Sequence, residues 1–536
     1  MPTLRWLTRD NDVRAADKVP YRLLEEVPEF GYGDLHDGNI LIQGDNLDAL
    51  KSLLPYYAGQ VKCIYIDPPY NTGSAFEHYD DNLEHSRWLA MMWPRLELLR
   101  ELLREDGILL VSLNDDEAHY FKIICDEIFG RKSFKGSFVW HYEGNTDNQA
   151  QIINYHEYIL IYCKGQLTIT PGVVDPNTGE TSKLNNPEIR NTVVKNGPKN
   201  PLKTVKIPAG FPASLPDGEF SPDPTSYPQW DGKFQVSEGR LTTGATATSG
   251  WSSRKILEQF VENDFKPVVD SKGQETRFEI TRTGAIEYIK GRKQDKGHII
   301  SVLRGFGTTN KSRMKLEKLG LKFTYPKPID LITYLVRIFS NGSDLVLDSF
   351  LGSGTTAHAV LEANRQDGCK RKFIAIEMSE ENAQNISYRR LQAAINGHEK
   401  AEIPATGGGF RFYRLGPSVF TEDGQLQPDI RFPVLAAHIW FAETATPWNE
   451  PKILTPFMGA SDGHGYVLLY NGILGDKSVS GGNVLTRKTL ATIRSAQGDF
   501  TGPLKVYGER TALSEATLKT EEIEFKQTPY DVKARK

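Results

Sequence analysis

The sequence predicts an α/β protein built on a largely parallel sheet that a long, proline-rich insertion interrupts. Short apolar runs alternate with helical periodicity through residues 1–165, which is the pattern of strands joined by crossover helices. Eleven of the thirty prolines then fall between residues 171 and 228, so regular elements must be short there. The alternation of strand and helix signals returns after Pro328.

The first half carries the signals of a twisted sheet with a covering helix. Val61–Asp67 and Ile108–Leu113 are short apolar runs of the buried-strand type, and apolar residues recur at helical spacing across Leu83–Arg104 between them. Asn114–Glu117 is typical of a helix cap and first turn, which we favour over metal ligation. Tyr155–Lys164 predicts a further strand, in which His156 is expected to be an ordinary edge or core residue.

The second half repeats the unit of strand, turn, helix and strand. Asp344–Phe350 predicts a strand, Thr356–Arg365 a helix and Lys372–Met378 another strand, and the Gly407–Gly409 triplet is interpreted as a linker. We therefore expect four parts, with boundaries at 1–165, 166–322, 323–405 and 406–536. The first and third parts would together form the sheet, the second would be the insertion, and the last would be a C-terminal α+β extension.

Composition excludes several classes of protein. The chain has 536 residues, more than one compact core usually holds, and no apolar run approaches the ~18 residues of a membrane span. The first ten residues lack a secretory pattern. The four cysteines lie far apart without zinc-type spacing, so we expect neither disulfides nor a metal ion. These features predict a cytoplasmic protein without a membrane partner.

Positive charge is concentrated in one region although the net charge is −4. Residues 181–330 carry 25 Lys and Arg against 16 Asp and Glu, a local excess of +9. A nucleic-acid footprint is local, so an acidic total does not exclude one. A solvated helix face is the alternative, and charge alone leaves it open. The candidate DNA contacts are Lys290, Arg292, Lys293, Arg304, Lys311, Arg313 and Lys315.

Asp67-Pro68-Pro69-Tyr70 ends the first predicted strand, at the sheet edge where α/β folds bind ligands. The prolines stiffen the turn and remove backbone donors. A planar exocyclic amine suits this set, because the Asp67 carboxylate and the Pro68 carbonyl can accept its two N–H bonds. Tyr70 can stack on a base taken out of a duplex. The alternative is a proline turn that merely caps a strand.

A glycine loop, Asp348–Thr356, connects the later strand to its helix. Gly352 and Gly354 let a ligand approach the backbone, and the helix N-terminus favours an anionic group. The loop is not a P-loop, because no lysine follows Gly354. Glu377 ends the next strand about twenty residues on, where an acid can bind ribose hydroxyls. Together they predict a cofactor that bears a nucleoside.

Gly44-Asp45-Asn46-Leu47 follows another apolar run, Asn39–Gln43. An acid at this point can accept from the adenine amino group of such a cofactor. A helix cap is an equally good interpretation of Asp45, and the sequence does not choose between the two.

Together these motifs resemble the DNA amino-methyltransferases that use S-adenosylmethionine. The catalytic motif precedes the cofactor loop, as in the beta group of that family, whose Rossmann-like domain is circularly permuted and carries an inserted target-recognition domain. A closer resemblance, to the modification subunit of type III restriction–modification systems, rests on Gln43–Leu50, Ile64–Gly73, Asn154–Lys164, Tyr325–Leu331 and the tail segments Val506–Glu509 and Phe525–Tyr530. The insertion lies outside this likeness.

The resemblance implies site-specific methylation of the N6 amine of adenine in double-stranded DNA. It assigns catalysis to Asp67, Pro68, Pro69 and Tyr70. It also implies a homodimer that can assemble with an ATP-dependent restriction (helicase–nuclease) subunit. The cofactor-binding residues would be Asp45, Asn46, Lys327, Asp348, Phe350, Gly352, Ser353, Gly354, Thr355 and Glu377.

Within that resemblance, Asp348 would bind the methionyl ammonium of the cofactor, Phe350 would pack on its adenine, and Lys327 would lie beside its methionyl end. The alternatives are a stand-alone DNA amino-methyltransferase and a catalytically silent DNA-recognition subunit. Methylation of RNA or protein is disfavoured by the motif order. An oxidoreductase would leave Asp67–Tyr70 without a role.

Overall fold

The structure is a computed structural model in which two compact units are distinguished. Residues 1–173 and 299–536 form one, the sheet unit, and residues 174–298 form the other, the insertion unit. The structure describes residues 3–70, 85–142, 154–170, 173, 175–178, 186–271, 273–291, 299–421, 427, 430–470, 473, 475 and 482–528. None of the helices in these ranges is long and apolar enough to cross a membrane.

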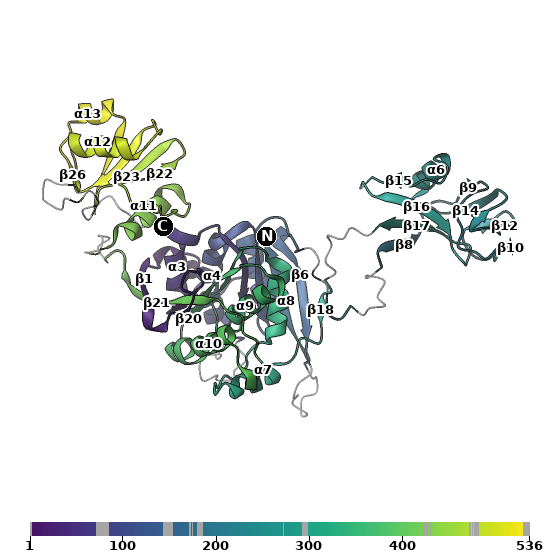
Figure 1. The fold of residues 1–536 in the computed structure, drawn as a ribbon, viewed down its shortest axis with the longest axis horizontal. Helices are drawn as coiled ribbons and strands as arrows, with labels where there is room; N and C mark the ends of the chain where they lie inside the picture. The colour runs from purple at the N-terminus through teal and green to yellow at the C-terminus, as the bar shows by residue number, and fades with distance from the viewer. Residues whose placement is uncertain are drawn as a thin grey trace. The chain divides into compact units, whose positions relative to one another are not determined.

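A mixed sheet forms the centre of the sheet unit (Figure 1). Its strand order is β1-β21-β3-β20-β19-β4-β5-β7-β6-β18, and β2 pairs with β21. The strands from β3 to β5 in this order are parallel, whereas β7 runs antiparallel to both β5 and β6. The strands are β1 (Arg22–Glu26), β2 (Tyr32–Gly33), β3 (Ile40–Gln43), β4 (Val61–Ile66), β5 (Leu103–Leu113), β6 (Phe134–His141), β7 (His156–Cys163), β18 (Val302–Leu303), β19 (Leu345–Asp348), β20 (Lys372–Glu377) and β21 (Gly409–Ser418).

Helices cover both faces of this sheet. Strand residues alternate between the two faces, so Ile64 and Ile66 of β4 pack on one side and Cys63 and Tyr65 on the other. The first side is covered by α3 (Asn46–Tyr57), α4 (His85–Leu102), α5 (Ala118–Phe129) and α11 (Phe432–Thr444). The second is covered by α8 (Ile329–Phe339), α9 (Thr355–Asp367) and α10 (Tyr388–Asn396). The α/β fold predicted from the alternating signals is confirmed.

The strand order reverses between β19 and β4, which sit side by side at the centre. From β4 the chain crosses through α4 to β5 on one side, and from β19 it crosses through α9 to β20 on the other. Because α4 and α9 cover opposite faces, the carboxyl ends of β4 and β19 flank an open crevice. Asp67 follows β4 and Asp348 ends β19, so the fold brings both motifs to this crevice.

The Gly407–Gly409 triplet is not a linker, because β21 enters the central sheet between β1 and β3. Gly409 serves close approach of the backbone, because a Cβ there would lie 2.1 Å from the amide nitrogen of Asp34. Residues 409–418 therefore belong to the sheet, and the expected boundary at 406 separates a strand from its own sheet.

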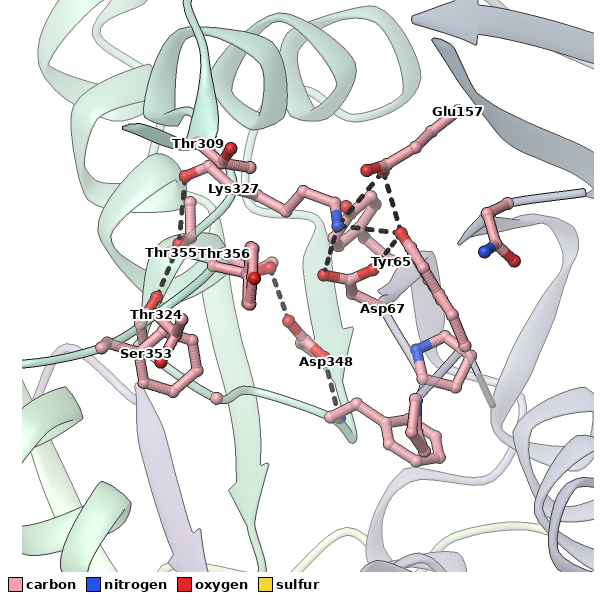
Figure 2. A pocket seen from close by; sticks show the side chains of 18 of the residues that line it. Tyr65, Asp67, Glu157, Thr309, Thr324, Lys327, Asp348, Ser353, Thr355 and Thr356 are labelled. Carbon is pink, nitrogen blue, oxygen red and sulfur yellow. Dashed lines mark hydrogen bonds and ion pairs between the residues drawn. The ribbon is translucent and has the colours of Figure 1, made fainter. Parts of the chain in front are cut away.

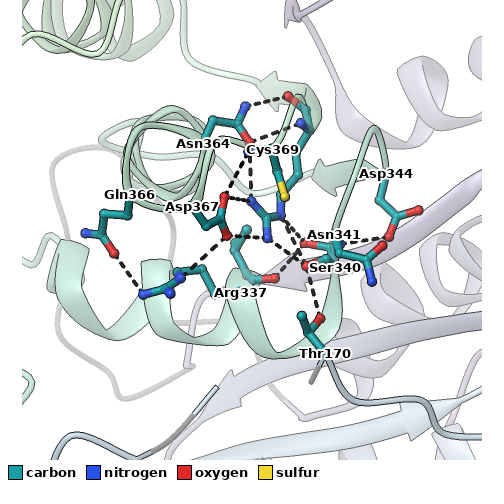
Figure 3. Close-up of polar contacts among 11 residues, drawn as sticks. Thr170, Arg337, Ser340, Asn341, Asp344, Asn364, Gln366, Asp367 and Cys369 are labelled. Carbon is teal, nitrogen blue, oxygen red and sulfur yellow. Dashed lines mark hydrogen bonds and ion pairs between the residues drawn. The ribbon is translucent and has the colours of Figure 1, made fainter. Parts of the chain in front are cut away.

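Arg371 joins α8, α9 and the start of β20 on one side of the sheet unit, and its partners Ser340 and Asp367 are labelled in Figure 3. Its guanidinium, whose side chain is fully buried, makes two hydrogen bonds of 2.9 and 2.8 Å to the carboxylate of Asp367 near the end of α9. The same group donates to the backbone oxygen of Ser340 at 2.8 Å, just after α8. Burial raises the pKa of Asp367, but the hydrogen bonds from Arg371 outweigh this and hold the pKa below its usual range.

The insertion unit has its own core, in which Phe211, Phe234, Phe260 and Phe278 are buried. Its strands are short, as the proline content predicts. They form the sheets β10-β12-β13, β11-β14-β9 and β15-β16-β17-β8. The elements are β8 (Glu188–Thr192), β9 (Lys203–Ile207), β10 (Gly218–Phe220), β11 (Gln229–Trp230), β12 (Phe234–Ser237), β13 (Arg240–Leu241), β14 (Ala245–Ser249), α6 (Arg254–Glu262), β15 (Val268–Val269), β16 (Glu275–Ile280) and β17 (Ile286–Gly291).

The expected insertion, residues 166–322, is longer than the compact unit of residues 174–298. Residues 299–322 belong to the sheet unit, because β18 pairs with β6 and α7 (Thr309–Lys318) follows in the same unit. The expected basic stretch is therefore divided between the two units.

The C-terminal part is an α+β arrangement with a second small core. Its main sheet has the order β22-β23-β25-β27, with β24 paired to β26. The elements are β22 (Phe457–Ser461), β23 (His464–Leu468), β24 (Val484–Leu485), α12 (Arg487–Ala496), β25 (Leu504–Gly508), β26 (Arg510–Thr511), α13 (Glu515–Thr520) and β27 (Ile523–Gln527).

Candidate active site

A cavity of about 490 Å³ lies at the crevice between β4 and β19. Residues from both predicted motifs line it: Asp67, Pro68, Pro69 and Tyr70 from the first, and Asp348, Phe350, Gly352, Ser353 and Thr355 from the second. The volume is in the range of sites that enclose a cofactor-sized molecule. The structure thus brings together two motifs that are distant in the sequence.

Asp67 and Tyr70 are tied to each other at this cavity. The Tyr70 hydroxyl lies 2.7 Å from Asp67 Oδ1. Burial, followed by the charges of Asp67 and Glu157, raises the pKa of Tyr70 well above its usual value, so the phenol stays a neutral donor. Trp88 donates to the Pro69 carbonyl at 2.7 Å. Among the described residues, no group donates to the Pro68 carbonyl, which leaves that oxygen available to a bound amine.

Lys327 contacts Asp67 as well as the glycine loop, and its ammonium lies beside Asp67 and Glu157 in Figure 2. Its ammonium lies 2.8 Å from Asp67 Oδ2 and donates to the Tyr70 hydroxyl at 2.8 Å. Its backbone carbonyl is 3.4 Å from the Thr355 hydroxyl of the loop. The resemblance placed Lys327 beside the methionyl end of the cofactor, which stays a prediction, and its ammonium contacts the carboxylate of Asp67.

Glu157 is a site residue that the sequence analysis missed. It lies on β7, lines the cavity, and is paired with Lys327 at 3.3 Å. The Tyr70 hydroxyl lies 2.9 Å from the same Glu157 oxygen. The neighbouring His156 was the residue considered on this strand. Its Nε2 atom lies 3.1 Å from the Tyr158 hydroxyl. A glutamate in an otherwise apolar strand was the only available signal.

Asp348 is a buried carboxylate at the start of the glycine loop. It accepts hydrogen bonds from the Thr356 hydroxyl at 2.5 Å and from the Phe350 backbone at 2.9 Å. Burial raises the pKa of Asp348 to about 7, although these hydrogen bonds oppose the shift. No cationic side chain in the described part of the chain pairs with it. A cation that enters the cavity would therefore stabilise the charged form of Asp348.

The glycine loop itself is held from behind. Gly354 has a φ of +82°, and a Cβ there would lie 3.2 Å from the Cα of Ser387. The guanidinium of Arg390 is buried and donates to the backbone oxygen of Ser353 at 3.2 Å and to the Thr355 hydroxyl at 2.8 Å. Desolvation lowers the pKa of Arg390 to about 9. These contacts fix the shape of the loop before any ligand binds.

Glu377 has a structural contact with the same loop. It is buried at the end of β20 and accepts from the Gly352 backbone at 2.7 Å and from the Ser379 backbone at 2.9 Å. It is not among the residues that line the described cavity. Its predicted contact with a ribose stays a prediction.

Asp45 and Asn46 make hydrogen bonds to the backbone near the glycine loop. The Asp45 side chain caps α3 by accepting from the Leu47 backbone at 2.8 Å, which is the helix-cap interpretation. The Asn46 amide donates to the backbone oxygen of Ser349 at 2.8 Å. Neither residue is among those that line the cavity.

The candidate DNA contacts fall into two groups. Lys290, in the insertion unit, forms a 2.5 Å ion pair with the buried carboxylate of Asp270, so it is not a free surface cation. Arg292 and Lys293 lie outside the described residues. Exposed side chains of the sheet unit make up the second group: Arg304 between β18 and α7, and Lys311, Arg313 and Lys315 on α7. The first residue of α7, Thr309, lines the cavity.

The chain is similar to two modification subunits of type III restriction–modification enzymes. It is 29% identical over 438 residues to the EcoPI Mod subunit of Escherichia phage P1, covering 73% of this chain and 66% of that one. It is 26% identical over 440 residues to the EcoP15I Mod subunit of Escherichia coli, covering 70% and 64%. The chain thus spans about two thirds of the length of the curated relatives it matches.

A solved structure and a family also match. The crystal structure of the M1.HpyAVI–SAM complex is 16% identical, with a TM-score of 0.29, covering 66% of this chain and 99% of that one. The DNA methylase family matches residues 61–388, a range that begins at β4 and ends in α10. That range contains Asp67–Tyr70 and the whole glycine loop. By this match over more than half of its length, the chain belongs to the DNA methylase family.

Proposed function

We propose that this protein transfers a methyl group from S-adenosylmethionine to the N6 amine of adenine in double-stranded DNA, in the cytoplasm. The observation that carries the proposal is that one cavity is lined both by Asp67–Tyr70 and by the glycine loop. One motif suits a planar amine and the other a nucleoside-bearing cofactor. Their shared cavity supports a direct transfer between two bound molecules.

The cavity residues fit S-adenosylmethionine in charge and shape. This cofactor carries a methionyl ammonium, and Asp348 is a buried carboxylate without a cationic partner among the described residues. Phe350, which lines the cavity and is largely buried, offers an aromatic face for an adenine ring. When bound there, the cofactor supplies an electrophilic methyl group on a sulfonium.

Catalysis on this geometry depends on orientation and charge. Asp67 and the Pro68 carbonyl would accept the two N–H bonds of the flipped adenine, which directs the nitrogen lone pair toward the methyl carbon. Tyr70 would stack on the base. The N–C bond forms as the C–S bond breaks and its electron pair stays on sulfur. The positive charge passes to the amine, which then loses a proton to solvent, so no strong base is required beforehand.

Cofactor affinity should depend on pH through Asp348. Its pKa is raised to about 7 in the folded protein, so the neutral acid prevails below pH 7 and the carboxylate that a cation needs appears as pH rises through 7. Affinity for S-adenosylmethionine should increase about tenfold from about pH 6 to about pH 8. Calorimetric titration of wild type and Asp348→Asn measures this. A wild-type affinity that is flat over this range, or an equal slope in Asp348→Asn, would contradict the assignment.

The same shift has the opposite sign for folding. A buried acid with a raised pKa stabilises the folded protein at low pH, and that contribution is lost as pH rises toward the folded pKa of about 7. As the pH rises toward 7, the affinity for the cofactor should therefore increase, while the free energy of unfolding of the free protein decreases.

Helix α7 is expected to bind the DNA backbone. Reversing the exposed Lys311, Arg313 and Lys315 to Glu should weaken binding to all sequences alike and reduce the slope of log affinity against log salt by up to about 3. Fluorescence anisotropy with a labelled duplex at several salt concentrations measures both quantities. The matched control reverses the exposed Arg487, Lys488 and Lys519 of the C-terminal part, with the same change in net charge. Equal effects of the two triple variants would mean that these three residues of α7 form a solvated helix face and do not contact DNA.

Adenine is proposed over cytosine because the first motif position is Asp67. Both bases present an exocyclic amine beside a ring nitrogen, but in the family that the motifs resemble Asp at this position usually accompanies adenine, whereas Ser more often accompanies cytosine. A carboxylate is also a stronger acceptor than a neutral group. We also propose a homodimer that works with an ATP-dependent restriction subunit, and the similarity to Mod subunits of restriction–modification enzymes supports the restriction partner. The test is to methylate DNA with the purified protein, digest it to nucleosides and separate them by mass. N6-methyldeoxyadenosine is expected, and N4-methyldeoxycytidine alone would overturn the base while keeping the reaction.

A further inference from the structure

Two carboxylates and one ammonium meet where the proposed function places the target amine. An ammonium has three N–H bonds, and that of Lys327 has three acceptors: Asp67 at 2.8 Å, Tyr70 at 2.8 Å and Glu157 at 3.3 Å. Both oxygens of Asp67 are engaged: Lys327 contacts one of them, as Figure 2 shows, and the Tyr70 hydroxyl contacts the other. The cluster as a whole carries a net charge of about −1.

This arrangement conflicts with the role of Asp67 unless something holds Lys327 elsewhere. The target amine must donate a hydrogen bond to an oxygen of Asp67, and Lys327 already contacts one of these oxygens. The amine also gains positive charge as the N–C bond forms, and an ammonium against Asp67 opposes that charge. Glu157 is the other carboxylate within reach of Lys327, and it answers both difficulties.

We propose that Glu157 is a positioning residue for methyl transfer. It retains Lys327 when the target amine binds Asp67, and its charge keeps the group net negative while the amine becomes positive. The inference rests on the proposed function, and it adds a residue that neither motif contains. Tyr70 can donate its single proton to either carboxylate, because its hydroxyl lies 2.7 Å from Asp67 and 2.9 Å from Glu157, so it can follow the exchange.

The surroundings of Glu157 suit a fixed anchor. Its side chain is 13% exposed and that of Lys327 is 7% exposed, so water screens their attraction little. Glu157 pairs with Trp140 across the β6–β7 ladder, which holds its backbone in place. Burial lowers the pKa of Lys327, but Asp67 and Glu157 outweigh this and raise it above its usual value, so Lys327 stays charged.

Three variants separate charge from mere structure. Glu157→Gln leaves one carboxylate against Lys327, a net charge near zero, and should lower the single-turnover rate roughly a hundredfold. The double variant Glu157→Gln/Lys327→Met restores a net charge of −1 and should recover at least about tenfold over Glu157→Gln. Affinity for S-adenosylmethionine should stay within about threefold of wild type in each. Glu105→Gln is the matched control, since Glu105 is 87% exposed and loses the same charge.

A binding measurement without cofactor tests the same idea independently of turnover. Two duplexes carry the recognition sequence read from modified host DNA, with adenine or unsubstituted purine at the target position, opposite an abasic site so that no base pair is broken. Wild type should prefer adenine severalfold, because only adenine offers the amine to Asp67. Glu157→Gln should lose this preference, and the double variant should regain it.

The outcomes are distinguishable. A wild-type protein that methylates no DNA would refute the proposed function itself. A wild type that methylates, together with a double variant no faster and no more selective than Glu157→Gln, would overturn the role of Glu157. If Glu157→Gln does not fold, Lys327→Met alone decides: without the ammonium, Asp67 no longer needs Glu157 to hold Lys327 away, so the preference for adenine over unsubstituted purine should be at least that of wild type. A weaker preference than wild type would overturn the proposal.

Discussion

Asp67→Ala should lower methyl transfer by at least about a thousandfold, while affinity for S-adenosylmethionine stays within about tenfold, or 1.4 kcal/mol. In the proposed function Asp67, which contacts Tyr70 and Lys327, accepts from the target amine, whereas Asp348, at the start of the glycine loop, is the acid for the cofactor. Removing Asp67 takes away the acceptor that orients the amine. Lys327 keeps Glu157 as its partner, so the fold should tolerate the change.

Single-turnover assays with labelled cofactor, alongside calorimetric titration of the cofactor, separate rate from binding. Asp499→Ala, an exposed change in the C-terminal part, serves as the control for handling and net charge. Near-normal turnover by Asp67→Ala would remove Asp67 from the mechanism. A parallel loss of cofactor affinity would move it to the cofactor side.

Arg371→Met should cost about 3–5 kcal/mol in the free energy of unfolding of the sheet unit. The change leaves the carboxylate of Asp367 without the bidentate partner that holds its pKa down, and it removes the Arg371 donors from the Ser340 carbonyl, which keeps a hydrogen bond of 3.2 Å from the Thr170 hydroxyl. Urea unfolding followed by tryptophan fluorescence measures the change from the midpoint and slope.

The matched control for this variant is Arg365→Met on α9, the helix that carries Asp367. Arg365 is 40% exposed and pairs with Glu362, and such surface pairs contribute less than about 1 kcal/mol. Adding Asp367→Asn to Arg371→Met should recover part of the loss, because it removes a charge that has lost its bidentate partner and keeps the 3.6 Å ion pair with Arg337. If Arg371→Met and Arg365→Met destabilise equally, the buried guanidinium does not hold these elements together.

The strands and helices that carry motifs were predictable because their local signals agree with the fold. Val61–Asp67 and Lys372–Met378 correspond to β4 and β20 within a residue, since a strand buried on both faces is an apolar run. The Gly407–Gly409 triplet was misread, because glycine serves both loops and close backbone approach. Only the packing of β21 against β2 distinguishes the two uses.

The site divides along the same line. The Asp67 and Asp348 motifs were predictable because each lies at the end of an apolar run. The pairing of β4 with β19 then brings them to one cavity. Glu157 has no comparable sequence signal, because its proposed role depends on β7 pairing with β5 and on a contact with Lys327, which lies 170 positions later in the chain. The pairing of Lys290 with Asp270 likewise depends on the fold of the insertion unit, and no charge count reveals it.

The central pair of strands has a consequence for how the chain is made. Val61 of β4 pairs with Leu345 of β19, so on the ribosome the middle of the sheet stays open until nearly two thirds of the chain has emerged. At about 5–20 residues per second that interval lasts tens of seconds, during which one edge of β4 has no neighbour. The insertion unit, with a core of its own, can fold within this interval. Late closure exposes an apolar strand to aggregation, so yield in a host cell should respond to chaperone supply more than to the stability of the finished protein.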